Sequence, residues 1–428
     1  MRTDVNAAAL DAALLARQGA LETMTRRWSA LAYLSAIGFL ALLYSNPQYW
    51  WPTLERLRLA FATMAIGALA TLAHRLTSGE RLRLGGRGAT FLFAYLAFVP
   101  LSLLWTLDHP ATMRATVDVA KLIVVYATIL NALDARSRLR TFLLVGALAS
   151  LGPSLGGIWT WWQGEGLVEG FRTRWRGLYA DPNRLAMSLT AVLPFALYGV
   201  YAARRAWTKL LFAGVVAAQV SAIVLTHSRS GAVAAAVATL AFLLRGRRGA
   251  VKGVVLAGAI GAGIVAFAPS TFWQRQATIA DFAEDASVAG REAAWTVLGV
   301  IVEERPLGGV GAGAFLSSWS RYAPLEAGGR RFVAHNIFME IVGDLGVVAF
   351  LLFSAYVFWL LRRTWRAGDD PLVGLEARAI AAGLVGYLVC ELANGYSLSW
   401  FLYFLFGAAA AAIRLSDLRA AMAEGRTA

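Results

Sequence analysis

The chain has 428 residues, of which 58% are hydrophobic and only 15% are charged, and its formal net charge is +14. An ordinary soluble domain of this length needs far more polar surface, so that class is excluded. The one cysteine, Cys390, excludes an intrachain disulfide and a cysteine metal site. No nucleic-acid-binding module accompanies the charge, so we expect no nucleic-acid partner and instead loops that face anionic membrane lipids.

Apolar runs recur along nearly the whole chain and predict an all-α, polytopic membrane protein. About twelve runs have a length near the ~20 residues that a helix needs to cross a bilayer. They lie near 28–44, 57–74, 89–105, 115–133, 141–162, 183–202, 208–226, 230–245, 251–268, 335–361, 377–394 and 398–414. Residues 1–27 are too polar for a cleaved signal peptide and are compatible with a short amphipathic helix at the inner surface.

The charge of the loops gives these spans a sidedness. The loop after every even-numbered span is basic, which is the pattern of cytoplasmic loops and predicts that both termini are cytoplasmic. The expected organisation is a cytoplasmic segment 1–27, spans one to nine in 28–268, an outer segment 269–334, spans ten to twelve in 335–414, and a cytoplasmic tail 415–428.

Two long segments, 163–182 and 269–334, lie on the outer side. Within the second, apolar residues at helical spacing between Arg291 and Glu304 predict an amphipathic helix along the outer membrane face. The glycines of 308–313 predict a flexible turn region, without the lysine of a phosphate-binding loop. Several arginines fall on this outer side, although Lys and Arg usually gather in cytoplasmic loops. They indicate an anionic ligand: Arg172, Arg174, Arg176, Arg184, Arg229 and Arg291.

Three of the predicted spans begin on the outer side with functional side chains. Helix N-termini attract anions because their N–H groups are free and the helix dipole is positive there. The sixth span begins Asp181-Pro182-Asn183-Arg184, the eighth follows His227-Ser228-Arg229-Ser230-Gly231, and the tenth follows Ala334-His335-Asn336. We hypothesise that these three ends converge into a pocket in which arginine forks bind phosphate oxygens.

His335 is the best single catalytic candidate. A helix N-terminus and nearby arginines should lower its pKa and leave it neutral, able to accept a proton as a general base. The alternative is an interfacial histidine that only caps the helix. Glu340 and Asp344 share one helical face and either orient the site or form a structural salt bridge.

The remaining outer residues have two interpretations each. Arg172, Arg174 and Arg176 alternate along a tryptophan-rich loop and either bind the ligand or contact lipid headgroups. Arg184 and Arg229 favour a phosphate-bearing ligand, whereas Arg291 fits ligand contact and a local ion pair equally well. Trp273, Trp295 and Trp319 favour anchoring at the interface over stacking on sugars. The outer carboxylates show no metal spacing, so we expect no metal site.

Four stretches together resemble the O-antigen ligase and polymerase superfamily of bacterial envelope enzymes. They are Arg176-Gly177-Leu178-Tyr179-Ala180-Asp181-Pro182-Asn183-Arg184, Ser228-Arg229-Ser230-Gly231, Arg291 with Trp295, and the stretch from Pro306-Leu307-Gly308-Gly309-Val310-Gly311 to Ala334-His335-Asn336, Glu340 and Gly346. Each motif is short and weak alone. Their order, spacing and common outer location make the set of four fairly specific.

The resemblance implies a multi-pass enzyme of the bacterial inner membrane whose site faces the periplasm, which makes 269–334 a periplasmic segment. It implies a glycan on undecaprenyl diphosphate as donor, a lipid A–core oligosaccharide as acceptor, and no cofactor or metal. His335 would be the base or would orient the acceptor. Arg184, Arg229 and Arg291 would bind the diphosphate. Supporting roles would fall to Arg176, Asn183, Ser228, Ser230, Asn336 and Glu340.

Within this superfamily, twelve spans and a compact 269–334 segment favour the ligase. O-antigen polymerases, exopolysaccharide polymerases and protein O-oligosaccharyltransferases share the same motifs and stay as alternatives. A transporter or flippase would place its polar residues on broken helices near the midplane, whereas most of those here lie at outer helix ends. A structural scaffold leaves the outer arginines unexplained.

Overall fold

The computed structural model describes residues 2–49, 51–244, 268–277, 286–323 and 330–425, together with four positions between them: Gly258, Gly261, Ala262 and Ala266. Within these residues the regular secondary structure is helical, and turns and loops join the helices; the exception is an isolated bridge between Val168 and Arg172. Eight of the helical segments described are long and apolar enough to cross a membrane. The predicted class, a polytopic all-α membrane protein, is therefore confirmed.

The helices follow the predicted spans closely. Their bounds are α1 Arg2–Ser45, α2 Leu59–Ser78, α3 Ala89–Leu101, α4 His109–Ala132, α5 Arg136–Ala149, α6 Leu151–Gln163, α7 Pro182–Ala202, α8 Ala206–Leu225, α9 Arg229–Leu243, α11 Ser270–Ala277, α12 Ala286–Glu304, α13 Phe315–Tyr322, α14 Ile337–Ala367, α15 Gly374–Glu391 and α16 Trp400–Ala423. The predicted span 251–268 lies almost entirely outside the described residues.

Three apolar helices fall outside the group of eight for identifiable reasons. α3 and α9 are shorter than a full span. α15 has enough residues but includes three charged side chains, Glu376, Arg378 and Glu391. Two of them, Glu376 and Glu391, are fully buried against protein, where an intramembrane charge can be accommodated.

Side-chain caps begin the three helices that carry most of the predicted site residues. Asp181 accepts hydrogen bonds from the N–H groups of Asn183 and Arg184 at the start of α7. Ser228 accepts from the Gly231 N–H at the start of α9. Asn336 accepts from the Phe338 and Met339 N–H groups at the start of α14. These caps hold the helix starts where the sequence predicts them.

α7 is the central helix of the bundle. Within its most apolar window 83% of the residues are buried, against 22% for α2. It packs on α5, α8, α9 and α15, and Gly383 of α15 allows close approach to the Ala191 carbonyl. Small residues let helix backbones pack tightly in this way, so the start of α7 is held by a rigid support.

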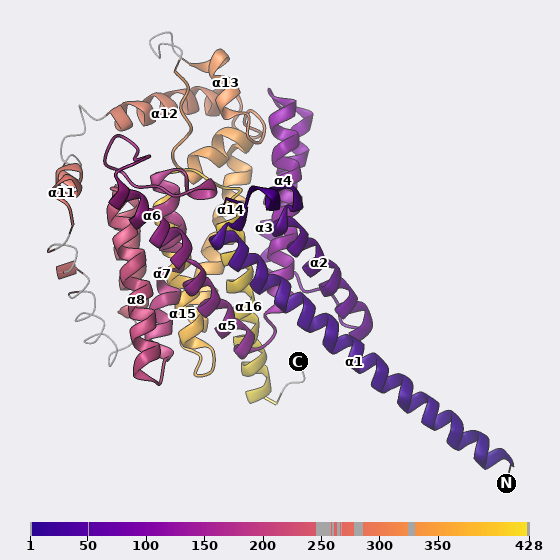
Figure 1. Ribbon diagram of the computed structural model, residues 1–428. Helices are drawn as coiled ribbons and strands as arrows, with labels where there is room; N and C mark the ends of the chain where they lie inside the picture. Colours follow the sequence, from indigo (N-terminus) through magenta and orange to yellow (C-terminus); the bar gives the residue numbers. More distant parts are fainter. Residues whose placement is uncertain are drawn as a thin grey trace.

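α12 and α13 lie across one end of the bundle, and the C-terminus lies at the other (Figure 1). α12 buries one face, formed by Ala294, Val297, Leu298 and Ile301, while Trp295 on its flank stays 43% exposed. The amphipathic helix expected between Arg291 and Glu304 is therefore present. Trp319 of α13 is buried in the same cluster rather than exposed as an interfacial anchor.

One expectation about the chain is wrong. Residues 2–27 do not form a separate short helix, because α1 runs without interruption from Arg2 to Ser45 and projects from the bundle (Figure 1). The glycines of 308–313 lie in turns, as expected, and the backbone of these turns is hydrogen-bonded to a break in α14. The Val310 and Gly311 N–H groups donate to the Gly343 and Asp344 carbonyls at 2.9 and 2.8 Å.

Gly346 makes this break possible. Its φ of 80° and ψ of 177° are not helical and are essentially restricted to glycine. Beyond the break, the Val347 N–H donates to the Pro306 carbonyl at 2.8 Å. A Cβ at position 346 would overlap the backbone of Leu307. Steric exclusion and backbone conformation therefore both require glycine here.

We predict that Gly346→Ala lowers the free energy of unfolding by at least about 2 kcal/mol, because alanine is strained in this conformation and overlaps Leu307. Thermal unfolding of the purified protein in detergent measures the effect. Gly214→Ala is the matched control, since Gly214 is helical and has open space around its Cβ position. Equal melting temperatures for the two variants would contradict the assigned role of Gly346.

Candidate active site at the turn between α15 and α16

Residues 392–399, the turn between α15 and α16, contact four segments that carry predicted site residues. We call this segment the 392–399 turn. It follows Glu391, the last residue of α15, and ends at Ser399, which caps α16. Its contacts with α7, α9, α12 and the start of α14 are described in turn.

The start of α14 is tied to the turn through two side chains. Asn336 caps α14 with its oxygen, and its Nδ2 donates to the Leu392 carbonyl at 3.0 Å. One carboxylate oxygen of Glu340 accepts from the N–H and the hydroxyl of Ser397, at 3.1 and 2.6 Å. Gly395 passes so close that a Cβ there would lie 3.1 Å from the other carboxylate oxygen.

α9 and α12 reach the same turn. The Asn394 amide donates to the Ser230 hydroxyl at 3.4 Å, and Ser230 also lies 3.3 Å from the Ser228 hydroxyl. Nη2 of Arg291, on α12, donates to the Ala393 carbonyl at 3.4 Å. The contacts of Ser230 and Arg291 with the turn each join residues that are more than 100 positions apart in the sequence.

Arg184 of α7 lies over the turn from the other side. Its guanidinium carbon is 4.1 Å from the ring centre of Tyr396, a cation–π contact. The arginine side chain is exposed. Arg184 and Arg291 therefore place two positive groups around one turn.

His335 immediately precedes Asn336, the cap of α14, and lies close enough to Arg291 for the two side chains to interact electrostatically. Partial burial lowers the pKa of its imidazole below the ordinary value of 6.5, the charge of Arg291 lowers it further, and Asp181 acts in the opposite direction. The expected direction is confirmed, although burial is the larger cause. His335 is consequently neutral near pH 7 and able to accept a proton.

The backbone of His335 is unusual. Its φ is 51°, in the left-handed region that few residues other than glycine adopt. His227 has the same conformation and likewise precedes a capping residue, Ser228. His227, however, is fully buried and its ring nitrogens lie 3.0 Å from the Leu225 carbonyl and 2.9 Å from the Thr271 hydroxyl. His335 is the more accessible of the two.

Some predicted residues lie away from the 392–399 turn. Arg176 is exposed, stacks over Trp175 and points toward the Tyr49 carbonyl. Together with Arg174 and Trp159 it lines a separate cavity of about 240 Å³. Arg229 is the first residue of α9 and is half-buried beside Ser228 and Ser230.

Arg172 has a structural position, contrary to its interpretation as a ligand or headgroup contact. It is 7% exposed and donates to the Thr226 carbonyl, to Glu169 and to the Asn183 side chain at 3.1, 3.1 and 2.9 Å. It therefore fastens the 163–182 loop to the ends of α7 and α8. Asn183 serves as one of its partners.

The salt-bridge alternative for the two acids of α14 is wrong. Glu340 accepts hydrogen bonds from Ser397, and Asp344 accepts from the Gly313 and Phe315 N–H groups at 2.7 and 3.1 Å. Glu340 thus positions the 392–399 turn, and Asp344 positions the start of α13. Both acids orient backbone rather than pair with a cation.

Sequence reasoning missed the turn itself and Glu391. The signal was present, since Asn394-Gly395 marks a turn and Glu391 is an acid at the end of an apolar run. Glu391 is fully buried, and in the described part of the chain neither of its carboxylate oxygens has a hydrogen-bond partner. Among the described residues, no group of three His, Cys, Asp or Glu side chains could hold a metal ion.

Comparison with known proteins gives a family-model match over part of the chain and a distant structural likeness. Residues 214–354 match the family model described as O-antigen ligase. The comparison with curated proteins gave no match. A chain from the structure described as "Structural coordination of polymerization and crosslinking by a peptidoglycan synthase complex" is 17% identical, with a TM-score of 0.43 over 79% of this chain and 97% of that chain.

The family match begins in α8 and ends in α14, so it includes Ser230, Arg229, Arg291, His335 and Glu340. Arg184 and the 392–399 turn lie outside it. The match of residues 214–354 to the O-antigen ligase family model supports membership of the O-antigen ligase/polymerase superfamily.

Proposed function

We propose that this protein is an O-antigen ligase, which transfers a glycan from undecaprenyl diphosphate to a sugar hydroxyl of lipid A–core at the periplasmic face of the inner membrane. The observation that carries the proposal is the gathering of Arg184, Arg291 and neutral His335 around the 392–399 turn. Members of this superfamily are glycosyltransferase-like enzymes. The contacts at the turn supply the groups that such a transfer needs.

In the proposed reaction, the acceptor hydroxyl oxygen attacks the anomeric carbon of the donor glycan. The new glycosidic bond forms as the bond between that carbon and the diphosphate oxygen breaks. His335 accepts the proton of the hydroxyl, and undecaprenyl diphosphate leaves with the bonding electron pair. Arg184 and Arg291, assisted by Arg229 at the α9 terminus, stabilise the negative charge that grows on the diphosphate.

An apolar cavity supports a polyprenyl donor. It measures about 230 Å³ and is lined by α7, α8 and α9, including Leu193, Ile223, Ala232 and Ala235. Ala232 and Ala235 follow Arg229 within two turns of α9. A lipid chain in this cavity would present its diphosphate near the α9 N-terminus.

The transporter alternative receives less support. α14 is interrupted at Gly346, as a transport helix is expected to be. The backbone carbonyls next to that interruption, however, accept hydrogen bonds from Val310 and Gly311. The break therefore holds the 306–314 segment in place rather than presenting these groups to a transported ion.

A reconstituted assay tests the proposed reaction. The purified chain is incubated with undecaprenyl-diphosphate-linked O-antigen and lipid A–core, and the products are separated on a gel. A ladder of extended lipopolysaccharide is the expected result. Longer lipid-linked glycan would instead identify a polymerase, and transfer only to an added peptide would identify a protein O-oligosaccharyltransferase.

His335 is predicted to set the pH dependence of transfer. Only its neutral form accepts a proton, so kcat/KM should fall with decreasing pH as the imidazole protonates, below pH 6.5, and should be level above that value. His335→Gln should lose about 10²–10⁴-fold in kcat and should also lose this acidic limb. A near-normal rate for the variant would show that His335 is not the general base. Donor binding by the same variant serves as the folding control.

Arg184→Ala is predicted to reduce kcat by about 10²-fold, because one positive group that stabilises the leaving diphosphate is removed. Arg174→Ala is the matched control, since Arg174 is an exposed outer arginine that hydrogen-bonds to the Gly166 carbonyl. Its rate should stay within about threefold of the parent protein. Equal losses for the two variants would mean that general outer charge, rather than Arg184, matters.

A further inference from the structure

A second polar cavity lies near the opposite ends of α14 and α16 from the 392–399 turn. It measures about 730 Å³ and is bounded by the segment before α3, by α4, by α14 and by α16. Its lining combines arginines and one acid with apolar side chains: Arg83, Arg87, Arg363, Arg414, Asp417, Leu84, Trp359, Ile413 and Leu418. The proposed reaction uses none of these residues.

The acids at this cavity are already engaged. Nη2 of Arg363 donates to both carboxylate oxygens of Asp417 at 2.7 Å. Arg83 pairs with Glu80 at 2.9 Å, and Glu80 also pairs with Arg75. Two cavity arginines, Arg87 and Arg414, form no ion pair with a carboxylate in the described part of the chain. The cavity therefore keeps their positive charge.

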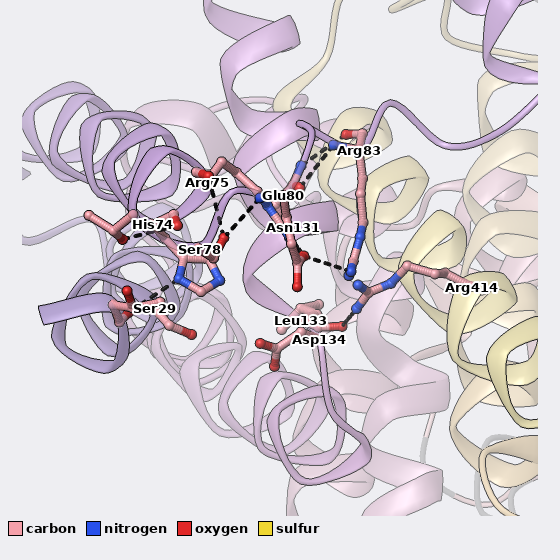
Figure 2. Close-up of polar contacts among 12 residues, drawn as sticks. Ser29, His74, Arg75, Ser78, Glu80, Arg83, Asn131, Leu133, Asp134 and Arg414 are labelled. Carbon is pink, nitrogen blue, oxygen red and sulfur yellow. Dashed lines mark hydrogen bonds and ion pairs between the residues drawn. The ribbon is translucent and has the colours of Figure 1, made fainter. Parts of the chain in front are cut away.

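Arg414 is partly buried and incompletely bonded. Its Nη2 donates to the Leu133 carbonyl at 3.0 Å, a contact that Figure 2 shows. Its Nε and Nη1 atoms are buried and have no hydrogen-bond partner among the described residues. A buried donor without a partner is unfavourable, so an acceptor in the cavity would be stabilised there.

The wall that bears Arg83 and Arg87 is held in a defined conformation. Asn131 of α4 accepts from the Arg83 N–H at 3.2 Å and donates to the Arg83 carbonyl at 2.9 Å (Figure 2). Gly85 and Gly86 have positive φ values of 99° and 74°, and Gly88 approaches Trp359 so closely that a Cβ would overlap the indole. These contacts therefore fix the conformation of the cavity wall.

This wall leads directly into the N-terminus of α3. The residue at the cap position, Gly88, offers no side chain, so the first N–H groups of α3 have no side-chain cap. These N–H groups donate instead to the carbonyls of Gly86, Arg87 and Gly88, so at this helix start only the positive end of the helix dipole adds to the attraction for an anion. Leu84, Trp359 and Leu418 give the same cavity an apolar part. Its ligand is therefore expected to combine an anionic group with an apolar part.

We propose that this cavity binds the headgroup of an anionic membrane phospholipid, with its phosphate between Arg87 and Arg414. The basic loops place this end of the bundle on the predicted cytoplasmic side, where anionic lipid is the adjacent surface. Headgroup and glycerol would contact α3, α14 and α16 together. The lipid thereby links α14, the helix that follows His335, to its neighbours at the other end.

Native mass spectrometry of the full chain tests the site. The protein is titrated separately with phosphatidylglycerol, phosphatidylcholine and inorganic phosphate. We expect selective retention of phosphatidylglycerol. The single variant Arg87→Gln should weaken phosphatidylglycerol binding by roughly fivefold. The double variant, Arg87→Gln with Arg414→Gln, should weaken it by more than about tenfold, as expected for charges near a lipid headgroup. Arg362→Gln, an exposed arginine of α14 outside the cavity, should leave it unchanged.

Three results would overturn the proposal. Equal retention of phosphatidylcholine would show that the site does not distinguish an anionic headgroup. Inorganic phosphate that binds as tightly as the lipid would identify a free-phosphate site. An equal loss in Arg362→Gln would indicate only general charge. Arg87 is exposed, so Arg87→Gln keeps the test valid even if the double variant fails to fold. Glycan transfer is not used as the readout, so failure here leaves the proposed reaction untouched.

Discussion

The hydrogen bonds of the 392–399 turn are the constraint on which the rest of the candidate site depends. Asn336 and Glu340 fix the start of α14 to this turn, Asn394 joins it to Ser230, and Arg291 reaches it from α12. Each such bond contributes about 0.5–1.5 kcal/mol, so no single one determines the arrangement. Together they place residues from four distant segments at one end of the bundle, next to a neutral histidine.

The break in α14 supports that arrangement from the side. Because Gly346 ends the first part of the helix, the carbonyls of Gly343 and Asp344 are free to accept from the 306–314 segment. The Asp344 carboxylate then fixes the start of α13. α12 and α13 are thus packed on the short first part of α14 that begins beside His335, which keeps Arg291 near the site. The same helix extends to the arginine-lined cavity at the opposite end.

Helix starts were the best-predicted part of the structure, because capping is a local property. The helices expected to begin near Asp181, Ser228 and Asn336 do begin there, and each of these residues is the N-cap. Long-range contacts were not predictable. The positive charge of a loop does not distinguish Arg172, which is buried and hydrogen-bonded to its own protein, from Arg184, which is exposed and stacks on Tyr396. The glycines in 308–313 contact a break in α14 at Gly346. The sequence did not show this contact, because the two segments come together only in the folded structure. The sidedness, the domain scheme and the roles of the site residues stay predictions.

The most direct test of the central claim is the position of the donor diphosphate in a structure of the full chain with undecaprenyl diphosphate bound. We predict that the diphosphate lies at the 392–399 turn, in contact with Arg184 and Arg291 and within reach of His335. A diphosphate bound instead in the cavity formed by Trp159, Arg174 and Arg176 would contradict it, since those residues lie apart from the turn. In that event the histidine would no longer adjoin the reacting bond.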